Sequence, residues 1–386
     1  MFERYVQTKF IPPSPPPVLD RGVWHWLRKN LFSTPVNCVV SVTLVLAIMY
    51  FAIPLVNWLI INAVWSGSDR KACTTNTQGG YMPDGWNGAC WAFVKANFWQ
   101  FIYGRYPDSE RWRVNVTALI VIVINLPLLI PACPFKIINA LISLFVVPVI
   151  GYFFLFGGHF GLPLVETQLW GGLLVTLTIA YCSITISLPL GSLLALGRRS
   201  RMPVVHLISM IFIETVRGIP LVAVLFIASV MLPLFLPQDM TFDKFLRALI
   251  GVALFTSAYI AEVVRGGLQA IPRGQYEAAE ALGLGYLKTM LLVILPQAYS
   301  LVIPGIINVL IGMFKETSLV YIIGMFDLLG IVRQAIQQAQ WSTPQTPLTG
   351  MIFIGIVFWV FCFGMSRYAH FIERRLNSPK TNGAEG

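Results

Sequence analysis

Charged side chains are scarce in this sequence. They make up 11% of its 386 residues, whereas hydrophobic residues make up 56%, and the mean hydropathy is +0.72. A soluble domain carries about 25% charged residues. A chain this apolar has too little polar surface to face water, so lipid must be its main solvent. The composition excludes an ordinary soluble protein and predicts an all-α, polytopic bundle of membrane helices.

The motifs of nucleotide-binding and metal enzymes are also missing. No GxxxxGK[ST] pattern occurs, so the chain has no P-loop for ATP. No HExxH pair occurs either, and the few histidines are scattered along the chain, which argues against a metalloenzyme. The histidines are His25, His159, His206 and His370. We therefore expect this chain to have no enzymatic activity, cofactor or metal of its own.

The net charge of +10 does not indicate nucleic acid binding, because the cations lie in short runs between apolar stretches and form no continuous basic face. The first 36 residues contain no apolar core that ends in a small-residue cleavage site, so we do not expect a signal peptide there. Prolines gather at residues 12–17 among scattered Lys and Arg. This composition predicts a cytoplasmic tail over 1–36, part of it extended polyproline.

Eight apolar stretches are each long enough to cross a bilayer, which takes roughly 20 residues. They are residues 37–64, 114–133, 137–157, 169–197, 203–235, 246–265, 298–324 and 347–369. We expect kinks at Pro54 and Pro220. If the N-terminus is inside, the inner segments hold 16 of the 27 Lys and Arg residues. This bias favours N- and C-termini in the cytoplasm.

The long loop 65–113, which this orientation places in the periplasm, contains Cys73 and Cys90. Disulfides persist in oxidising compartments, so we expect these two cysteines to pair, with two free thiols as the alternative. The loop is also rich in aromatic residues. We favour an amphipathic helix on the outer membrane interface, and contact with a periplasmic binding protein is the alternative.

The segment 265–297 predicts two short helices joined by a turn. Pro272 suits a helix start, and residues 277–282 are strong helix formers. The glycines at 283 and 285 end that helix, and a second helix starts near Tyr286. Pro296 must kink or stop the second helix. The alanines at 278, 279 and 281 leave a shallow face against which another protein can lie.

This segment resembles the EAA loop of bacterial ATP-binding-cassette (ABC) importer permeases. That pattern is Glu-Ala-Ala, three residues, Gly, nine residues and Ile-x-Leu-Pro. Here Glu277-Ala278-Ala279 precedes Gly283 and Val293-Ile294-Leu295-Pro296, with Val293 in place of Ile. In the family this loop docks on the ATPase, which implies coupling roles for Gly274, Glu277, Ala278, Ala279, Gly283, Leu295 and Pro296. An ordinary amphipathic loop helix is the alternative.

Flanking motifs extend the resemblance over about 169–370 and narrow it to polar-amino-acid permeases of the histidine and glutamine type. They are Gly171-Gly172-Leu173, Gly197-Arg198-Arg199-Ser200-Arg201, Glu214-Thr215-Val216-Arg217-Gly218, Ala258-Tyr259-Ile260-Ala261-Glu262 and Lys315-Glu316-Thr317-Ser318-Leu319. The family core is a five-helix, type I ABC-importer permease domain. The three further apolar stretches within 37–168 look like those of the M-type permease of the general L-amino-acid importer. We expect 371–386 to be a cytoplasmic tail.

The resemblance implies a subunit of a bacterial inner-membrane importer for L-amino acids that works by alternating access. Its implied partners are a cytoplasmic ABC ATPase dimer that holds ATP and Mg²⁺, a second homologous permease subunit, a periplasmic amino-acid-binding protein and membrane lipid. Nucleic acid is not among them. The alternative is a secondary transporter driven by an ion gradient, although the sequence has no evident internal repeat of that class.

Ionisable groups within the apolar stretches are candidates for the substrate pathway. Glu214 and Arg217, at i and i+3 on one helix, can pair on one face. Glu316 stands where the family usually has Asp, and with neighbouring polar groups it can accept the ammonium of an amino acid, while Arg217 can meet the carboxylate. Internal structural pairs are the alternative. The pathway candidates are Glu214, Arg217, Asn308, Gly312, Lys315, Glu316, Thr317 and Ser318.

Overall fold

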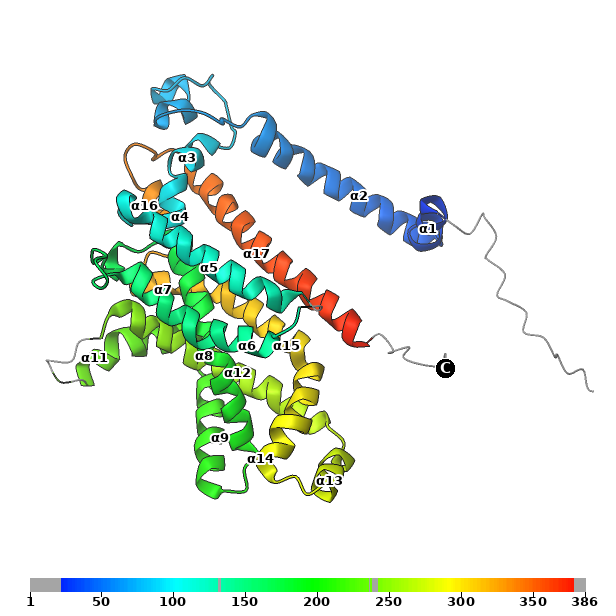
Figure 1. Ribbon diagram of the computed structural model, residues 1–386. Helices are drawn as coiled ribbons and strands as arrows, with labels where there is room; N and C mark the ends of the chain where they lie inside the picture. Colours follow the sequence, from blue (N-terminus) through cyan, green and yellow to red (C-terminus); the bar gives the residue numbers. More distant parts are fainter. Residues whose placement is uncertain (1–21, 131–132, 236, 238–241, 378–386) are drawn as a thin grey trace, which may run out of the picture. The chain divides into compact units, whose positions relative to one another are not determined.

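The computed structural model describes residues 22–130, 133–235, 237 and 242–377, and every named element in those ranges is helical (Figure 1). The expected all-α class is therefore confirmed for the described chain. The chain divides into two compact units. The first runs to Ala63 and includes Gly85–Ala89, and the second contains Val64–Asp84 and the chain from Cys90 onward.

The first unit contains α1 (Val23–Asn30), α2 (Pro35–Val56) and a π-helical turn, Asn57–Ile61. Thr34 caps α2, because its hydroxyl accepts a hydrogen bond from the Asn37 amide at 3.2 Å. Helix α1 lies within the segment 1–36, where a tail was expected, and the proline run lies outside the described residues. At Pro54 the chain stays helical and changes to π-helical geometry three residues later.

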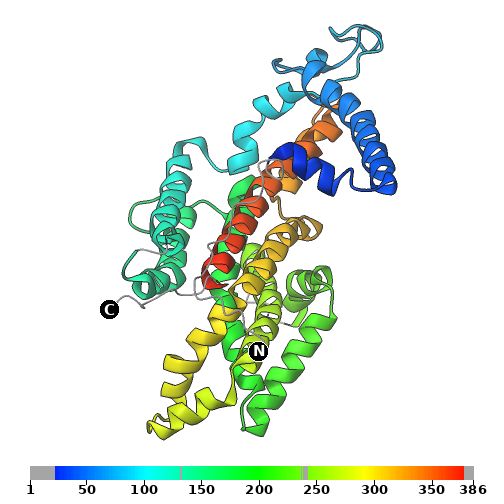
Figure 2. The same ribbon diagram turned by 90° about the vertical axis from the view of Figure 1, so that its right-hand side faces the viewer.

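The second unit is a bundle of long helices connected in part by shorter ones (Figure 2). The longer helices are α5 (Arg111–Leu129), α7 (Val147–Phe156), α8 (Gly172–Arg198), α9 (Pro203–Gly218), α12 (Lys244–Ala270), α15 (Leu295–Glu316) and α17 (Thr346–Asn377). The shorter helices are α3 (Trp91–Ala96), α4 (Phe98–Tyr103), α6 (Lys136–Leu141), α10 (Leu221–Phe226), α11 (Leu232–Phe235), α13 (Arg273–Ala281), α14 (Tyr286–Lys288) and α16 (Leu328–Ile336).

Seven helices of the described chain are long and apolar enough to cross a membrane. An eighth crossing results if the bent pair Pro203–Gly218 and Leu221–Phe235 is counted as one span. This pair corresponds to the expected span 203–235, but it bends by 107° where a simple kink was expected. The break lies at Ile219 and Pro220, both of which have extended backbone. Proline restricts the residue before it to extended geometry, which explains the position of the break.

The loop expected at 265–297 is shorter than the sequence suggested. Helix α12 continues to Ala270 and stops because Ile271, which precedes Pro272, is extended. The next helical run, Tyr286–Ile323, is continuous where a span starting at 298 was expected. Pro296 does not stop it, because Pro296 lies in the first turn of α15, directly after the π-helical turn Thr289–Ile294. The first turn of a helix needs no hydrogen bond from the nitrogen of proline.

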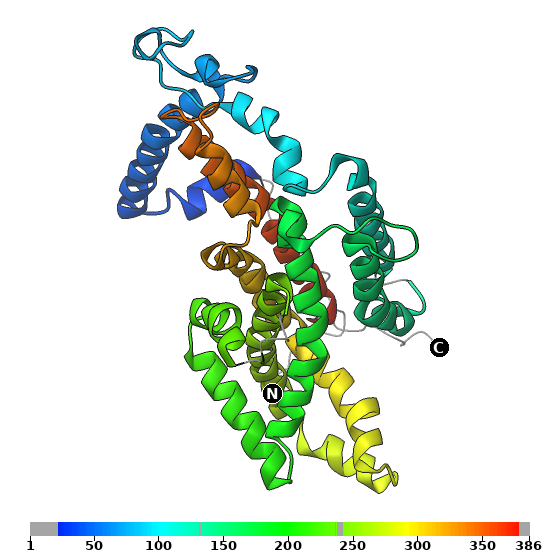
Figure 3. The same cartoon turned by 90° about the vertical axis from the view of Figure 1, so that its left-hand side faces the viewer.

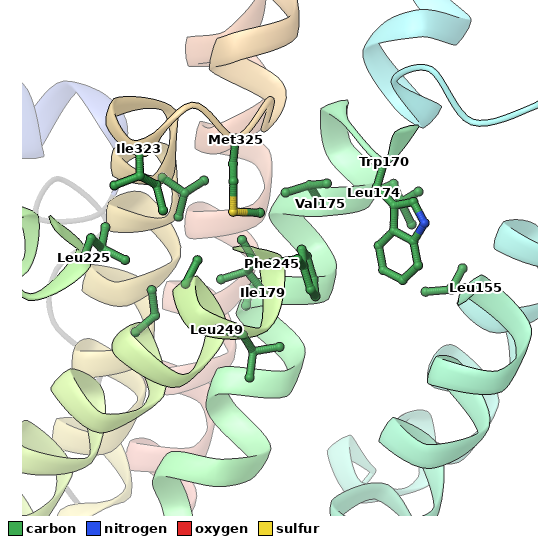
Figure 4. Packing of buried hydrophobic residues seen from close by; sticks show 14 of the residues in the cluster. Leu155, Trp170, Leu174, Val175, Ile179, Leu225, Phe245, Leu249, Ile323 and Met325 are labelled. Carbon is green, nitrogen blue, oxygen red and sulfur yellow. The ribbon is translucent and has the colours of Figure 1, made fainter. Parts of the chain in front are cut away.

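Helix α8 is central to the second unit. Its side chains Leu174, Val175 and Ile179, with Trp170 just before the helix, pack in one buried cluster with Phe245 of α12 (Figure 4). Further along α8, a Cβ atom on Gly191 would lie 2.7 Å from Ile260 Cγ2 and 2.8 Å from the Ser257 carbonyl oxygen. The absence of a side chain at Gly191 therefore allows α8 and α12 to lie in direct backbone contact.

The loop 65–113 carries the disulfide Cys73–Cys90, whose Cα atoms are 5.8 Å apart. Its aromatic residues divide into two groups. Phe93 and Phe101 are fully buried and contact the rings of Trp341 and Phe353. Tyr103 and Tyr106 are buried as well, whereas Phe98 and Trp99 are exposed. Much of the loop therefore packs onto the second unit itself, which differs from the expected helix lying on the membrane interface.

Candidate coupling and translocation site

The loop with the EAA pattern forms the short helix α13 at one end of the second unit, opposite the end that carries α3 and α16 (Figures 1 and 3). Pro272 precedes the helix in extended geometry, and Glu277 and Ala278 face outward. Ala279 is only 2% exposed and contacts the body of the protein. The expected shallow alanine face therefore consists of Ala278 and Ala281, while Ala279 anchors the helix.

Helix α13 ends in a Schellman motif. The Gly283 amide donates to the Glu280 carbonyl at 2.9 Å, and the Leu284 amide donates to the Ala279 carbonyl at 3.1 Å. This motif requires a left-handed residue at its centre, and Gly283 has φ +73°. Gly285 differs from the expectation because its φ of −67° is ordinary, and it precedes α14 in extended geometry.

The turn after α13 presents apolar side chains to solvent. Leu282 is 79% exposed, Tyr286 69% and Leu287 68%. Large apolar side chains that cluster at an exposed turn are typical of a surface that another protein covers. The position and exposure of this turn make α13 and its flank suitable for docking a partner.

Contacts with the ends of the long helices hold α13 in place. Arg199, just after α8, donates to the Leu268 carbonyl at 2.6 Å and to the Tyr276 hydroxyl at 3.3 Å, and its guanidinium lies over the Tyr276 ring. Gln297 Nε2 donates to the Gln275 side chain at 3.1 Å. Leu295 is buried beside this loop, while Pro296 is exposed. Any force on α13 is therefore transmitted to α8, α12 and α15.

A network of ion pairs lies one to two helical turns from this loop. Glu262 of α12 accepts hydrogen bonds from Arg265 Nε at 3.0 Å and from Arg198 of α8 at 3.2 Å. Its carboxylate is also 3.7 Å from a guanidinium nitrogen of Arg217, on α9. Arg198 in turn binds Glu214 of α9 at 2.6 Å. The network joins the ends of three helices.

The pair expected between Glu214 and Arg217 does not form in the described part of the chain: Glu214 binds Arg198 and Arg217 binds Glu262. Spacing at i and i+3 permits a pair, but it cannot reveal that stronger partners come from neighbouring helices. The sequence did offer a signal, since Arg198 and Glu262 both lie in the flanking family motifs.

The remaining pathway candidates lie on α15 and the 3₁₀ turn Thr317–Ile323 that follows it. Asn308 and Lys315 are exposed, and Glu316 is partly exposed. The hydroxyls of Thr317 and Ser318 donate to carbonyls of their own helix at 2.7 and 2.9 Å. Those two hydroxyls are therefore already hydrogen-bonded within the chain. At Gly312, an added Cβ atom would have no neighbour within 4 Å. No hydrogen bond or ion pair within the described ranges joins this group to Arg217.

Comparison with known proteins covers both the region that carries the family motifs and the region before it. The family model described as "Binding-protein-dependent transport system inner membrane component" matches residues 187–378. The "Inner membrane amino-acid ABC transporter permease protein YhdY" of Escherichia coli (strain K12) is 47% identical over 96% of this chain and 97% of its own length.

Two other relatives show how the extra region is shared. The "Glutamate/glutamine/aspartate/asparagine transport system permease protein BztC" of Rhodobacter capsulatus is 36% identical over 96% of this chain and 98% of its own length. The "L-cystine transport system permease protein TcyB" of Bacillus subtilis is 32% identical over 55% of this chain and 90% of its own length. The first two relatives therefore match nearly the whole of this chain, whereas this shorter one matches about half of it.

Proposed function

Since this chain belongs to the family of binding-protein-dependent transport system inner membrane components and is an ABC-importer permease, we propose that its cargo is an L-amino acid. The observation that carries the proposal is the match to an amino-acid permease, 47% identical over 96% of this chain. The chain is a multi-pass membrane protein of the inner membrane. The relative with 47% identity is named as an ABC transporter permease, and no observation favours the ion-gradient alternative.

The exposed coupling loop supports docking of a separate ATPase. Helix α13 presents Glu277 and Ala278 outward, and the adjoining turn exposes Leu282 and Tyr286. A cytoplasmic ATPase dimer then binds ATP and Mg²⁺ and moves the loop. A second homologous permease completes the pore, and a periplasmic amino-acid-binding protein delivers the cargo.

This proposal fixes the orientation of the chain. The coupling loop must face the cytoplasm, and the turn between α8 and α9, which is rich in arginine, lies at the same end of the second unit (Figures 1 and 3). The disulfide Cys73–Cys90 then belongs to the periplasm, where such bonds persist. Both termini lie in the cytoplasm.

For the substrate pathway we retain Lys315 and Glu316, which end α15 with exposed or partly exposed side chains. Ionisable groups within a membrane span are costly unless they face water, protein or cargo. Glu316 is suited to accept the ammonium group of an amino acid. Glu214 and Arg217 instead take part in the internal network described above.

The test is uptake of labelled L-amino acids into proteoliposomes that contain this chain, its ATPase and the second permease. The binding protein is supplied on the side that corresponds to the periplasm, and ATP on the other. We expect uptake that requires ATP hydrolysis and persists when ionophores abolish ion gradients. Uptake that follows an imposed ion gradient without ATP would refute the proposal. Glu316→Ala should reduce cargo-stimulated ATP hydrolysis, and unchanged stimulation would remove Glu316 from the pathway.

A further inference from the structure

Glu262 occupies the centre of the ion-pair network, and neither the family pattern for the coupling loop nor the pathway candidates include it. Its side chain is 24% exposed and faces three guanidinium groups, those of Arg198, Arg217 and Arg265. With Glu214 the network contains three cations and two anions. Removing the charge of Glu262 would leave three close cations with one anion, so the arrangement depends on this carboxylate.

The network lies at a break in the structure. Arg217 is the last residue but one of α9, and the chain bends by 107° between α9 and the helical segment that starts at Leu221. Helix α12 holds Arg217 at two places on one face: the Glu262 carboxylate, and the Tyr259 ring one turn earlier, 5.6 Å from the guanidinium carbon. Arg217 thus attaches the last turn of α9, just before the break, to α12.

The other side of the network leads to the coupling loop. Arg198 is the last residue of α8, and the next residue, Arg199, binds Leu268 of α12 and Tyr276 of α13. Glu262 lies eight residues before the end of α12 at Ala270, which is about 12 Å along a helix. A displacement of α13 therefore reaches Glu262 through two routes, the α8 end and α12 itself.

We propose that Glu262 is a positioning residue for transport, which holds the ends of α8 and α9 on α12 and so links the coupling loop to the α9–α10 break. Glu262 touches no cargo in this role. It keeps Arg198 and Arg217 in one arrangement, so that movement of α13 changes the angle at the break. The inference rests on the proposed function, because it needs an ATPase that moves α13.

The test uses the complete complex in proteoliposomes, with the amino-acid-loaded binding protein as the probe. Glu262→Gln should lower the ratio of stimulated to basal ATP hydrolysis by about fivefold or more, the range of a typical coupling free energy. Basal hydrolysis should stay at or above the wild-type rate, because the ATPase surface is untouched. Glu166→Gln, which changes an exposed carboxylate outside the network, is the matched control and should leave the ratio unchanged.

Conservative and alternative variants keep the test decisive. Arg217→Lys keeps a cation opposite Glu262 and should retain most of the stimulation, whereas Arg217→Gln should lose it. Arg217→Gln also carries the test if Glu262→Gln fails to assemble, since it leaves Glu262 paired with Arg198 and Arg265. An unchanged ratio, or a parallel fall of basal and stimulated hydrolysis with a lower melting temperature, would overturn the inference. A wild-type complex without any stimulation would instead refute the proposed function.

Discussion

Gly283 offers a direct test of whether the shape of the coupling turn matters. Its φ of +73° is in the left-handed region, and a Cβ atom there would meet nothing within 4 Å. Gly283→Ala therefore adds backbone strain without a steric clash. An alanine in this conformation costs about 1–2 kcal/mol. That free energy should favour opening of the two hydrogen bonds that end α13.

Hydrogen exchange measures this opening directly, since the Gly283 and Leu284 amides donate the two bonds. A cost of 1–2 kcal/mol corresponds to about 5- to 30-fold faster exchange at these amides. Gly285→Ala is the matched control. Gly285 has φ −67° and equally open surroundings, so its substitution should leave the exchange rates within about twofold.

The same substitution should weaken coupling to the ATPase. If the ordered turn is the docking form, the ATPase concentration needed for half-maximal activity should rise for Gly283→Ala by the factor by which the ordered fraction of the turn falls. Gly285→Ala, at a position whose φ of −67° suits alanine, should leave docking unchanged. Equal exchange in Gly283→Ala and Gly285→Ala would refute the structural reasoning. A lower ordered fraction of the turn with unchanged docking would refute the role of the turn.

Three further predictions concern the end of the second unit opposite α13. Burial raises the pKa of Asp327 from 3.8 to about 7. The folded protein therefore binds the carboxyl proton more tightly than the unfolded chain does. The free energy of unfolding should fall by up to about 4 kcal/mol as the pH rises from 4 to 7. Asp327→Asn can keep the helix cap and should remove this fall, so that the melting temperature changes less between pH 4 and pH 7. An unchanged slope of melting temperature against pH would contradict this. Arg113 is fully buried and donates to the carbonyls of Phe154 at 2.5 Å and Pro163 at 2.9 Å. Arg113→Met should therefore lower the free energy of unfolding by about 3–5 kcal/mol, measured by thermal unfolding. A decrease no larger than that caused by Arg111→Met, at a more exposed arginine, would contradict this. Replacing both Cys73 and Cys90 by serine opens a loop of 17 residues and should lower the free energy of unfolding by about 3 kcal/mol. A melting temperature equal to that of the wild-type protein would contradict the pairing.

The sequence was sufficient for the membrane helices and for the coupling loop. Long apolar stretches form helices in lipid, because their backbone N–H and C=O groups must be hydrogen-bonded within the segment. The EAA spacing located α13 and its terminal glycine, since both follow from local backbone preferences. The ends of the loop were less certain from sequence, because Pro296 is compatible with a helix break and equally with a first turn that follows a π-helical turn.

Contacts between helices could not be predicted in the same way. Glu214 and Arg217 are compatible with a local pair, but their actual partners depend on how the ends of α8, α9 and α12 meet. The burial of Ala279 is similar, because the identity of a small residue does not tell which face of α13 contacts the protein. Both outcomes are set by packing of segments that are distant in sequence.

The attachment of the extra helices shows how such packing is made specific within a membrane. In the π-helical turn Ile142–Val146, between α6 and α7, the Ser143 carbonyl accepts a hydrogen bond from the Tyr181 hydroxyl of α8 at 2.9 Å. The Ser143 hydroxyl lies 2.8 Å from the Tyr181 hydroxyl oxygen and donates to the side-chain carbonyl of Asn125 of α5 at 2.8 Å. Apolar surfaces alone do not fix one register in lipid, which is as apolar as the helices, whereas polar bonds between helices do. The cluster of Asn125, Ser143 and Tyr181 therefore holds the segment from α5 through α7 against α8. The far end of α8 joins the ion-pair network of Glu262.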